Sequence, residues 1–282
     1  MARECEMIND GTSDVTLESI TAQLTGPVAL REAQTLVFDG QAPVGLLGVE
    51  NEVDGREIFI DAYALGPRRR ELLDGLLARG LGHARAVAAA TYTTDHEYVD
   101  AIVSAGLTRV RTYWRMILDL EGWPRIAPQA PDHVTKRVVD GESDQRLLLR
   151  LRNESFADHF GETFERNFED SLAQLLATEG CDPSRWWIAE CDGEPVGLCI
   201  LDDSKAEFDE SYVRTLGVVP SARGRGIARW LLQCAAADAV VRGREGLALT
   251  VDGRNTTGAT RLYESVGFHT RQQLDLYCYP LV

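Results

Sequence analysis

One stretch, residues 215–232, constrains what this chain can fold into more than any other. An apolar run stops at Pro220, an Arg/Gly segment follows at residues 223–226, and from Ile227 apolar residues recur at i+4, i+7 and i+8. This spacing is typical of one helical face, so the stretch predicts a strand, a glycine-rich loop and a helix in direct succession. Such a loop leads into a helix start with unpaired backbone N–H groups and the positive end of the helix dipole. Helix starts of this kind bind phosphate groups.

Length and charge bound the remaining possibilities. The 282 residues suit two domains, at roughly 140 residues each. With 29 basic and 44 acidic residues the net charge is −15. This charge argues against a nucleic-acid-binding surface and favours cationic or neutral small partners, and solubility alone would also explain it.

The targeting and metal signals of the sequence are weak. The chain starts with acidic residues and contains no apolar run of membrane-spanning length, so we expect a cytoplasmic protein without a membrane segment. The six cysteines form no C-x-x-C pair and the five histidines show no metal-ligand spacing. We therefore expect reduced thiols and no metal site.

Periodicity and turn residues divide the chain into two series of elements. In the first half we expect strands at residues 35–38, 44–49, 57–65, 86–92 and 109–120, and helices at 68–84 and 98–104. In the second half we expect strands at 134–139, 186–191, 196–201, 212–219, 247–251 and 268–279, and helices at 144–156, 164–177, 227–241 and 257–266. Three prolines and no periodicity mark a linker, so the expected domains are residues 1–122 and 133–282, joined by 123–132.

The two halves resemble each other. Residues 39–46 match residues 192–198, each an Asp-Gly turn before a strand, with one insertion. Residues 104–107 likewise match residues 265–268, each opening a final strand. Because both matches occur in the same order, we interpret the chain as a duplicated domain.

Two motifs of the second half resemble a known family. Residues 223–228, Arg-Gly-Arg-Gly-Ile-Ala, fit the R/Q-x-x-G-x-G/A signature of the GCN5-related N-acetyltransferases (GNAT). Residues 255–268 are similar to the second signature of that family, an Asn followed by L-Y-E-x-x-G-F. The resemblance covers roughly residues 134–280 and, more faintly, 35–120. The two-copy arrangement resembles tandem acetyltransferases of the mycothiol synthase type. The resemblance implies an α/β fold of two tandem GNAT-type domains, each a mixed, mostly antiparallel sheet flanked by helices.

Other interpretations of the glycine loop fit less well. A dinucleotide-binding G-x-G-x-x-G would need a third glycine where Arg229 stands. A Walker loop would need Gly-Lys followed by Ser or Thr, which is absent. A turn with a purely structural role remains an alternative.

The resemblance also implies where acetyl-CoA binds. The backbone of Leu216, Gly217 and Val218 would pair with the pantetheine arm as an added strand. The backbone N–H groups of the loop and helix start would hold the pyrophosphate, and Asn255 would contact the pantetheine or adenylate side. The loop and helix-start residues are Arg223, Gly224, Arg225, Gly226, Ile227, Ala228 and Arg229.

The reaction that the resemblance implies is direct attack of a primary amine on the thioester. Tyr263 stands where relatives carry the acid that protonates the leaving thiolate, although a packed tyrosine would explain it as well. The family's strand glutamate is replaced by Tyr212, which we assign to substrate binding. We assign the base to Glu210, on the same strand face two residues earlier. The acidic residues 202–209 either line the acceptor mouth or form a solvated loop.

The acceptor pocket is expected around residues 153–161. Asp158 and His159 lie there between two phenylalanines, in the region that covers the acceptor in this family. A helix C-terminal turn closed by Gly161 would explain the same residues without a function.

The first half departs from the loop pattern. Residues 66–70, Gly-Pro-Arg-Arg-Arg, lack the two spaced glycines, and Pro67 has no N–H. We therefore expect this half to be a degenerate, non-catalytic GNAT-like domain. Three arginines at a helix start oppose the helix dipole, which favours a bound anion there.

The function that we expect is acetyl transfer from acetyl-CoA to the primary amine of a small molecule by the second half. The alternatives are a non-catalytic acyl-CoA-binding or regulatory protein, and a protein or peptide N-acetyltransferase. The sequence implies no nucleic-acid, membrane or metal partner, and it does not determine the acceptor or the oligomeric state.

Overall fold

The computed structural model describes residue 29 and residues 33–51, 58–82, 87–126, 128–157, 168–178, 180–254 and 258–279. The described chain forms two compact units. The first unit comprises the described residues up to 114, residues 252–254 and the residues from 272 on. The second unit comprises residues 115–251 and, among the described residues after them, 258–271.

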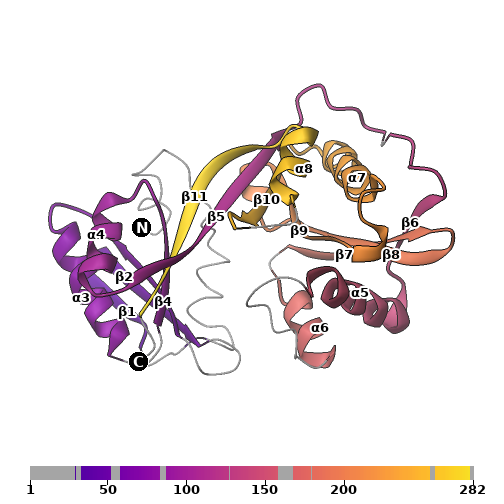
Figure 1. Ribbon diagram of the computed structural model, residues 1–282. Helices are drawn as coiled ribbons and strands as arrows, with labels where there is room; N and C mark the ends of the chain where they lie inside the picture. The colour runs from indigo at the N-terminus through magenta and orange to yellow at the C-terminus, as the bar shows by residue number, and fades with distance from the viewer. Residues whose placement is uncertain are drawn as a thin grey trace. The chain divides into compact units, whose positions relative to one another are not determined.

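The first unit is a sheet with two helices packed on it (Figure 1). Its strands are β1 (Thr35–Asp39), β2 (Ala42–Asn51), β3 (Ile58–Ala64) and β4 (Val87–Tyr92), with the ends of β5 (Thr108–Asp119) and β11 (His269–Cys278) that lie in this unit. Its helices are α3 (Arg69–Leu81) and α4 (His96–Ser104). Strands β1 to β3 pair antiparallel and β3 pairs parallel to β4. The core is made by buried side chains such as Leu47, Ile60, Leu73, Leu77 and Ile102.

The second unit is a sheet between two pairs of helices. Its strands are β6 (Val134–Val138), β7 (Cys181–Cys191), β8 (Glu194–Asp202), β9 (Glu210–Val218) and β10 (Gly246–Asp252). Helices α5 (Gly141–Phe156) and α6 (Phe168–Leu176) lie on one side of the strands, and α7 (Ile227–Val241) and α8 (Ala259–Val266) on the other (Figure 1). Two single turns of 3-10 helix, η1 (Ala206–Phe208) and η2 (Pro220–Ala222), flank β9. Strands β6 to β9 pair antiparallel, and β9 pairs parallel to β10.

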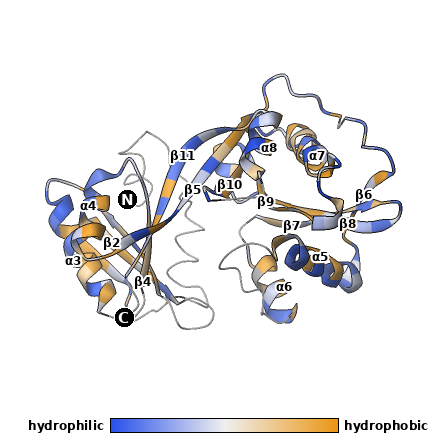
Figure 2. Ribbon diagram, in the orientation of Figure 1, coloured by the Kyte–Doolittle hydropathy of each residue, from blue (hydrophilic) through white to orange (hydrophobic). Residues whose placement is uncertain are grey.

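Helix α7 forms where the periodicity predicts it, over residues 227–241. Ile227, Leu231, Cys234 and Ala235 are all buried, and the helix is rich in alanine and leucine, which favour helix. Figure 2 shows hydrophobic residues along β9 and β10 of this unit. The core of the second unit therefore lies between α7 and these strands.

The order and type of the expected elements agree with the structure, with ends shifted by a few residues. The longest shift is in β7, which starts at Cys181 and not near Trp186, because it pairs with β8 as far as Asp202 across an irregular segment. The boundaries of the two compact units also differ from those of the domains expected from the sequence, residues 1–122 and 133–282. The last part of β11 belongs to the first unit because it pairs with β4, from Leu274↔Tyr92 to Cys278↔Ala88.

No helix of the described residues is long and apolar enough to cross a membrane.

Candidate functional site

Strand β9 leaves its neighbour β10 after a short contact. The two strands pair over only three residues, Glu210 to Tyr212. On its other edge β9 carries a bulge against β8, where Val213 and Thr215 face consecutive residues. A bulge bends its strand and increases its twist. The end of β9 therefore continues along β8 alone and leaves one backbone edge open.

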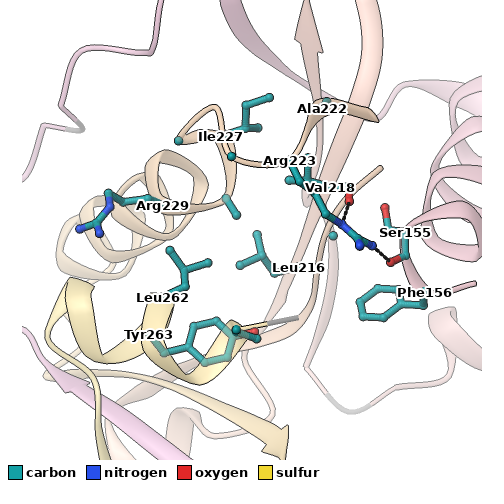
Figure 3. A pocket seen from close by; sticks show the side chains of 16 residues that line it. Ser155, Phe156, Leu216, Val218, Ala222, Arg223, Ile227, Arg229, Leu262 and Tyr263 are labelled. Atoms are coloured by element: carbon teal, nitrogen blue, oxygen red, sulfur yellow. Dashed lines mark hydrogen bonds between the residues drawn. The ribbon is translucent and has the colours of Figure 1, made fainter. Parts of the chain in front are cut away.

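A pocket of about 300 Å³ opens at this end of β9 (Figure 3). Its wall is built from the end of α5, the end of β9, the loop before α7, the start of α7, and α8. The lining residues are Ser155, Phe156, Leu216, Gly217, Val218, Ala222, Arg223, Gly224, Gly226, Ile227, Ala228, Arg229, Gly258, Ala259, Leu262 and Tyr263. The pocket thus unites nearly all of the described residues that the sequence assigns to acetyl-CoA.

The loop before α7 has the backbone of an anion site. Gly224 and Gly226 adopt φ values of 78° and 80°, in the left-handed region that glycine tolerates. Gly226 is the N-cap of α7, and no side chain caps its N–H groups. Successive N–H groups in such a turn form an anion-binding concavity, and the helix dipole adds positive potential. A side chain at either glycine would be strained, so the loop depends on both.

The arginines of this loop have different roles. Arg223 donates from Nε to the carbonyl of Val218 at 3.2 Å and from Nη2 to the carbonyl of Ser155 at 2.9 Å. Arg229 donates to the carbonyl and hydroxyl of Ser265 in α8, at 3.0 and 2.7 Å. Arg225 is half exposed and its guanidinium lies 3.9 Å from the nearest carboxylate oxygen of Asp192. Among the described residues, Arg225 is therefore the only one of these three whose guanidinium is not shown bound to a backbone carbonyl, although it does not line the pocket as Arg223 and Arg229 do.

The open edge of β9 can be assigned from its hydrogen bonds. The N–H of Val219 donates to the carbonyl of Val196 in β8 at 2.9 Å. Backbone groups alternate between the two edges of a strand. Gly217 therefore presents its backbone to β8, and Leu216 and Val218 present theirs to the pocket side. These are the positions expected to pair with a ligand arm.

Tyr263 points its hydroxyl into the pocket (Figure 3). It lies in α8, half-buried, with its ring centroid 6.0 Å from that of Phe268. Burial raises the pKa of Tyr263 to about 12, with smaller contributions from Cys199 and Tyr212. Within the described chain its hydroxyl has no hydrogen-bond partner, so the alternative of a hydroxyl capped by backbone is not what the structure shows.

Glu210 does not line the pocket, which argues against its assignment as general base. It is 2% exposed, and its carboxylate accepts hydrogen bonds from Arg115 at 2.6 Å and from Arg271. A buried carboxylate that binds two guanidinium groups and lies outside the pocket lining is not positioned to take a proton from an amine in the pocket. Sequence alone could not show this, because Arg115 is 95 residues away along the chain.

Tyr212 does not line the pocket either. It is half-buried, and the guanidinium of Arg214 lies over its ring at 5.3 Å. Tyr212 sits where β9 still pairs with β10, before the strand opens. Its assigned contact with the acceptor stays a prediction.

The acidic connection before β9 is part of an ion-pair network. Asp202 is 1% exposed and pairs with Arg214, and Asp203 pairs with Arg185 at 2.7 Å. Arg185 is itself buried and also binds Asp238 of α7. Asp202 and Asp203 therefore offer no unpaired charge to an acceptor, because neighbouring guanidinium groups neutralise them, whereas Glu207 and Asp209 are exposed to solvent.

Three assigned residues lie outside the described residues: Asp158, His159 and Asn255. Their assigned roles stay predictions. Over the described parts of the chain, no group of three His, Cys, Asp or Glu side chains is placed to hold a metal ion.

Six residues line the pocket without having been predicted for the cofactor site: Ser155, Phe156, Ala222, Gly258, Ala259 and Leu262. Gly258 is the N-cap of α8 with φ 80°, and a glycine before a helix was the available signal. The helix-end position of Ser155 and Phe156 was visible, but their contact with β9 depends on the packing of α5.

The first unit repeats the geometry of β9, since β3 also pairs with its parallel neighbour over only three residues, Ile58 to Ile60. Gly45 pairs with Ala64 as Gly197 pairs with Val218, so Ala64 corresponds to Val218. By the same register Ala62 corresponds to Leu216. The N–H of Ala62 donates to the buried Tyr98 hydroxyl at 3.0 Å, and the Ala64 carbonyl accepts from Arg69 Nε at 3.0 Å. Side chains of this unit thus occupy backbone groups that face the pocket in the second unit.

The three arginines of the first unit are paired. Arg68 binds Glu71, Arg70 binds Asp74, and the buried Arg69 binds Asp95 with both terminal nitrogens. The anion that the arginine run suggested is therefore not required, because carboxylates already balance the charge.

The fold and the site define a class of protein. The sheet opened at one strand end, beside an uncapped helix start, is the GNAT-like α/β fold. A GCN5-related N-acetyltransferase from Sphaerobacter thermophilus shares it with a TM-score of 0.78 at 22% identity, over 100% of this chain and 91% of that chain. A tandem GNAT protein from the clavulanic acid biosynthesis pathway shares it with a TM-score of 0.64 at 14% identity, over 87% and 83%.

Residues 182–270 match the family model of the acetyltransferase (GNAT) domain, so the chain contains a GNAT domain and is related to this superfamily through it. A mycothiol acetyltransferase of Thermobispora bispora is 35% identical over 177 residues, which are 61% of this chain and 58% of the relative. The chain thus spans less than two thirds of that relative. A mycothiol acetyltransferase of Rhodococcus erythropolis is 29% identical over 248 residues, 82% of this chain and 79% of the relative.

Proposed function

We propose that this protein is an acetyl-CoA-dependent N-acetyltransferase that acetylates the primary amine of a small molecule in its second unit. One observation carries the proposal. A single pocket has an uncapped helix start with two left-handed glycines at one end and a protonated tyrosine hydroxyl at the other. A coenzyme A thioester needs both features: a place for its phosphates and an acid near its sulfur.

The residues present fit acetyl-CoA. The N–H groups from Gly224 to Ala228 can hold the pyrophosphate, with Arg225 as the nearby charge. The open edge of Leu216 and Val218 can pair with the pantetheine arm. When bound, acetyl-CoA supplies an activated acetyl group on a thiol leaving group.

Tyr263 is the proposed acid. Because its pKa is raised to about 12, its Oη keeps the proton at neutral pH and can give it to the leaving sulfur. The base is not Glu210, whose carboxylate is held by Arg115 and Arg271. Asp158 and His159 follow the pocket residue Phe156 closely along the chain, so they remain the proposed contacts for the acceptor.

The relatives supply the first acceptor to test. The curated relatives are named mycothiol acetyltransferases, so we propose a mycothiol-related amine as the acceptor class. Asp202 and Asp203 are paired with arginines and offer no unpaired negative charge at the acceptor site. This agrees better with a small acceptor than with a cationic peptide.

We further propose that the chain is a tandem of two GNAT-like domains with one working site. The matched register of β2–β3 and β8–β9 supports the duplication. Tyr98 supports the loss of the first site, since its hydroxyl accepts from the N–H of Ala62, the counterpart of Leu216, whose backbone a pantetheine arm would need.

Calorimetry with acetyl-CoA tests the proposal. We expect one molecule bound per chain, and no measurable binding by Gly226→Asp, which places a charge and a strained side chain in the phosphate site. Gly243→Asp is the matched control, because Gly243 also has a positive φ, of 77°, but lies beyond the end of α7. Equal binding by both variants would refute the site.

A second function is favoured by one observation. Among the described lining residues there is no carboxylate or imidazole that could act as a base. A non-catalytic acyl-CoA-binding protein would need none. Thiol release from acetyl-CoA in the presence of a mycothiol-related amine distinguishes the two, since the binding protein would release thiol only at the rate of hydrolysis.

A further inference from the structure

The hydroxyl of Ser155 is a buried polar group without a partner. Ser155 is 4% exposed, and its Oγ has no hydrogen-bond partner among the residues that the structure describes. Buried hydroxyls are nearly always hydrogen-bonded, and a serine within a helix commonly bonds the carbonyl one turn earlier. Ser155 is the last residue but one of α5 and lines the pocket. Its hydroxyl therefore requires a partner that the described part of the chain does not provide.

Ser155 lies directly on the backbone of β9. A Cβ placed on Gly217 would come within 2.8 Å of Ser155 Cβ and 2.9 Å of its Oγ. Only a glycine allows this approach. Gly217 stands between Leu216 and Val218, the two residues whose backbone faces the pocket. The hydroxyl thus lies beside the segment of β9 that pairs with a ligand arm.

Arg223 holds the end of α5 in this place. Its guanidinium joins the carbonyl of Ser155 to the carbonyl of Val218 (Figure 3). Arg69 makes the corresponding contact in the first unit, with the carbonyl of Ala64. The contact recurs where no loop of spaced glycines exists, so it serves to clamp the strand and not to bind phosphate. A clamped serine is preorganised for a ligand.

We infer that the Ser155 hydroxyl hydrogen-bonds an amide group of the pantetheine arm of coenzyme A. The inference rests on the proposed function. An amide carbonyl accepts from a hydroxyl and an amide N–H donates to it, so either orientation satisfies Ser155. The arm is favoured over the phosphates as the partner, because Ser155 lies against Gly217 within β9, whereas the Gly224–Gly226 turn follows beyond η2.

Two ligands separate this contact from the phosphate site. Coenzyme A has both the pantetheine arm and the phosphates, whereas adenosine 3′,5′-bisphosphate lacks the arm. We expect Ser155→Ala to weaken coenzyme A binding, measured by calorimetry, by about 3- to 10-fold. Binding of adenosine 3′,5′-bisphosphate should not change. Ser143→Ala, an exposed serine of the same helix, is the matched control and should leave both affinities unchanged.

The outcomes decide the inference. Unchanged coenzyme A affinity in Ser155→Ala would overturn it, and so would an equal loss for both ligands, which would mean a general disturbance of α5. Gly217→Ala provides a second test, because the added methyl must displace Ser155 and should weaken coenzyme A selectively in the same way. If the unchanged protein bound no coenzyme A, the proposed function itself would fail. If it bound normally and only the variants disagreed, the role of Ser155 alone would fail.

Discussion

Asp95 is the residue of the first unit whose loss should cost most, because three groups depend on it. Its two carboxylate oxygens accept from Arg69 Nη1 and Nη2 at 2.9 and 2.5 Å. Its Oδ1 also accepts from the N–H of Tyr98 at 3.1 Å and so caps α4. Arg69 is 7% exposed and Asp95 6% exposed. Asp95→Ala would remove the main carboxylate partner of the buried Arg69 guanidinium and, at the same time, the N-cap of α4.

The magnitude follows from these contacts. Removing one partner of a buried ion pair costs about 3–5 kcal/mol, and losing an N-cap about 1 kcal/mol. Arg69 keeps Glu97 and the Ala64 carbonyl as partners, which reduces the cost of breaking the buried ion pair. We therefore expect Asp95→Ala to lower the free energy of unfolding of the first unit by about 3–4 kcal/mol.

Urea unfolding with hydrogen exchange of the α3 and α4 amides measures this loss within the first unit. Asp74→Ala is the control, because Asp74 pairs with Arg70 on the surface of α3, where a pair contributes about 0–1 kcal/mol. The double variant Arg69→Met/Asp95→Asn should lose less than Asp95→Ala, since it strands no charge. Equal losses in Asp95→Ala and Asp74→Ala would refute the reasoning.

Four further predictions concern the second unit. Tyr263→Phe should lower kcat by roughly 100-fold or more with little change in coenzyme A affinity, because a proton donor acts in the transition state; equal losses in rate and affinity would indicate a binding role. Since the pKa of Tyr263 is raised to about 12, its acid form persists as pH rises, so a pH–rate profile should show no loss from this group between about pH 7 and 10. Arg225→Gln should weaken coenzyme A binding and reduce its salt dependence, whereas Arg229→Gln should leave the salt dependence unchanged, because Arg229 binds Ser265; titrations at two salt concentrations check this. Glu210→Gln should lower stability by about 3 kcal/mol while the folded enzyme keeps its rate, because Glu210 holds Arg115 and Arg271 and does not line the pocket; a selective loss of kcat with stability retained would restore Glu210 as the base.

The helices, the strands and the glycine-rich loop at residues 223–226 were predictable, because each is specified by residues that are close together in the sequence. The helix at residues 227–241 follows from apolar spacing within four turns of chain, and its bounds agree with the structure. The two left-handed glycines follow from the need for backbone torsion that other residues rarely adopt. A catalytic role for Tyr263 was expected from a family resemblance and stays a proposal; the structure shows that Tyr263 lines the pocket.

The roles of the charged residues were harder to predict, because each role depends on which oppositely charged side chain lies beside it in the fold. The strand position of Glu210 suggested a catalytic base. In the structure its carboxylate binds Arg115 and Arg271, which are 95 and 61 residues away in the sequence. The arginines at 68–70 suggested an anion, and Arg69 is balanced by Asp95, 26 residues later. Such pairs are invisible to periodicity, since it reports only which residues share a face.

By itself the sequence determined where strands and helices lie and which loop can accept a phosphate, because burial patterns, caps and glycine torsions are properties of neighbouring residues. Only the tertiary structure decided which charges are already neutralised, that β11 ends beside β4, and that Ser155 rests on Gly217. Those facts depend on distances between segments remote in sequence. The same arginine is a phosphate ligand or a strand clamp according to which carbonyls folding brings within its reach, as Arg223 shows.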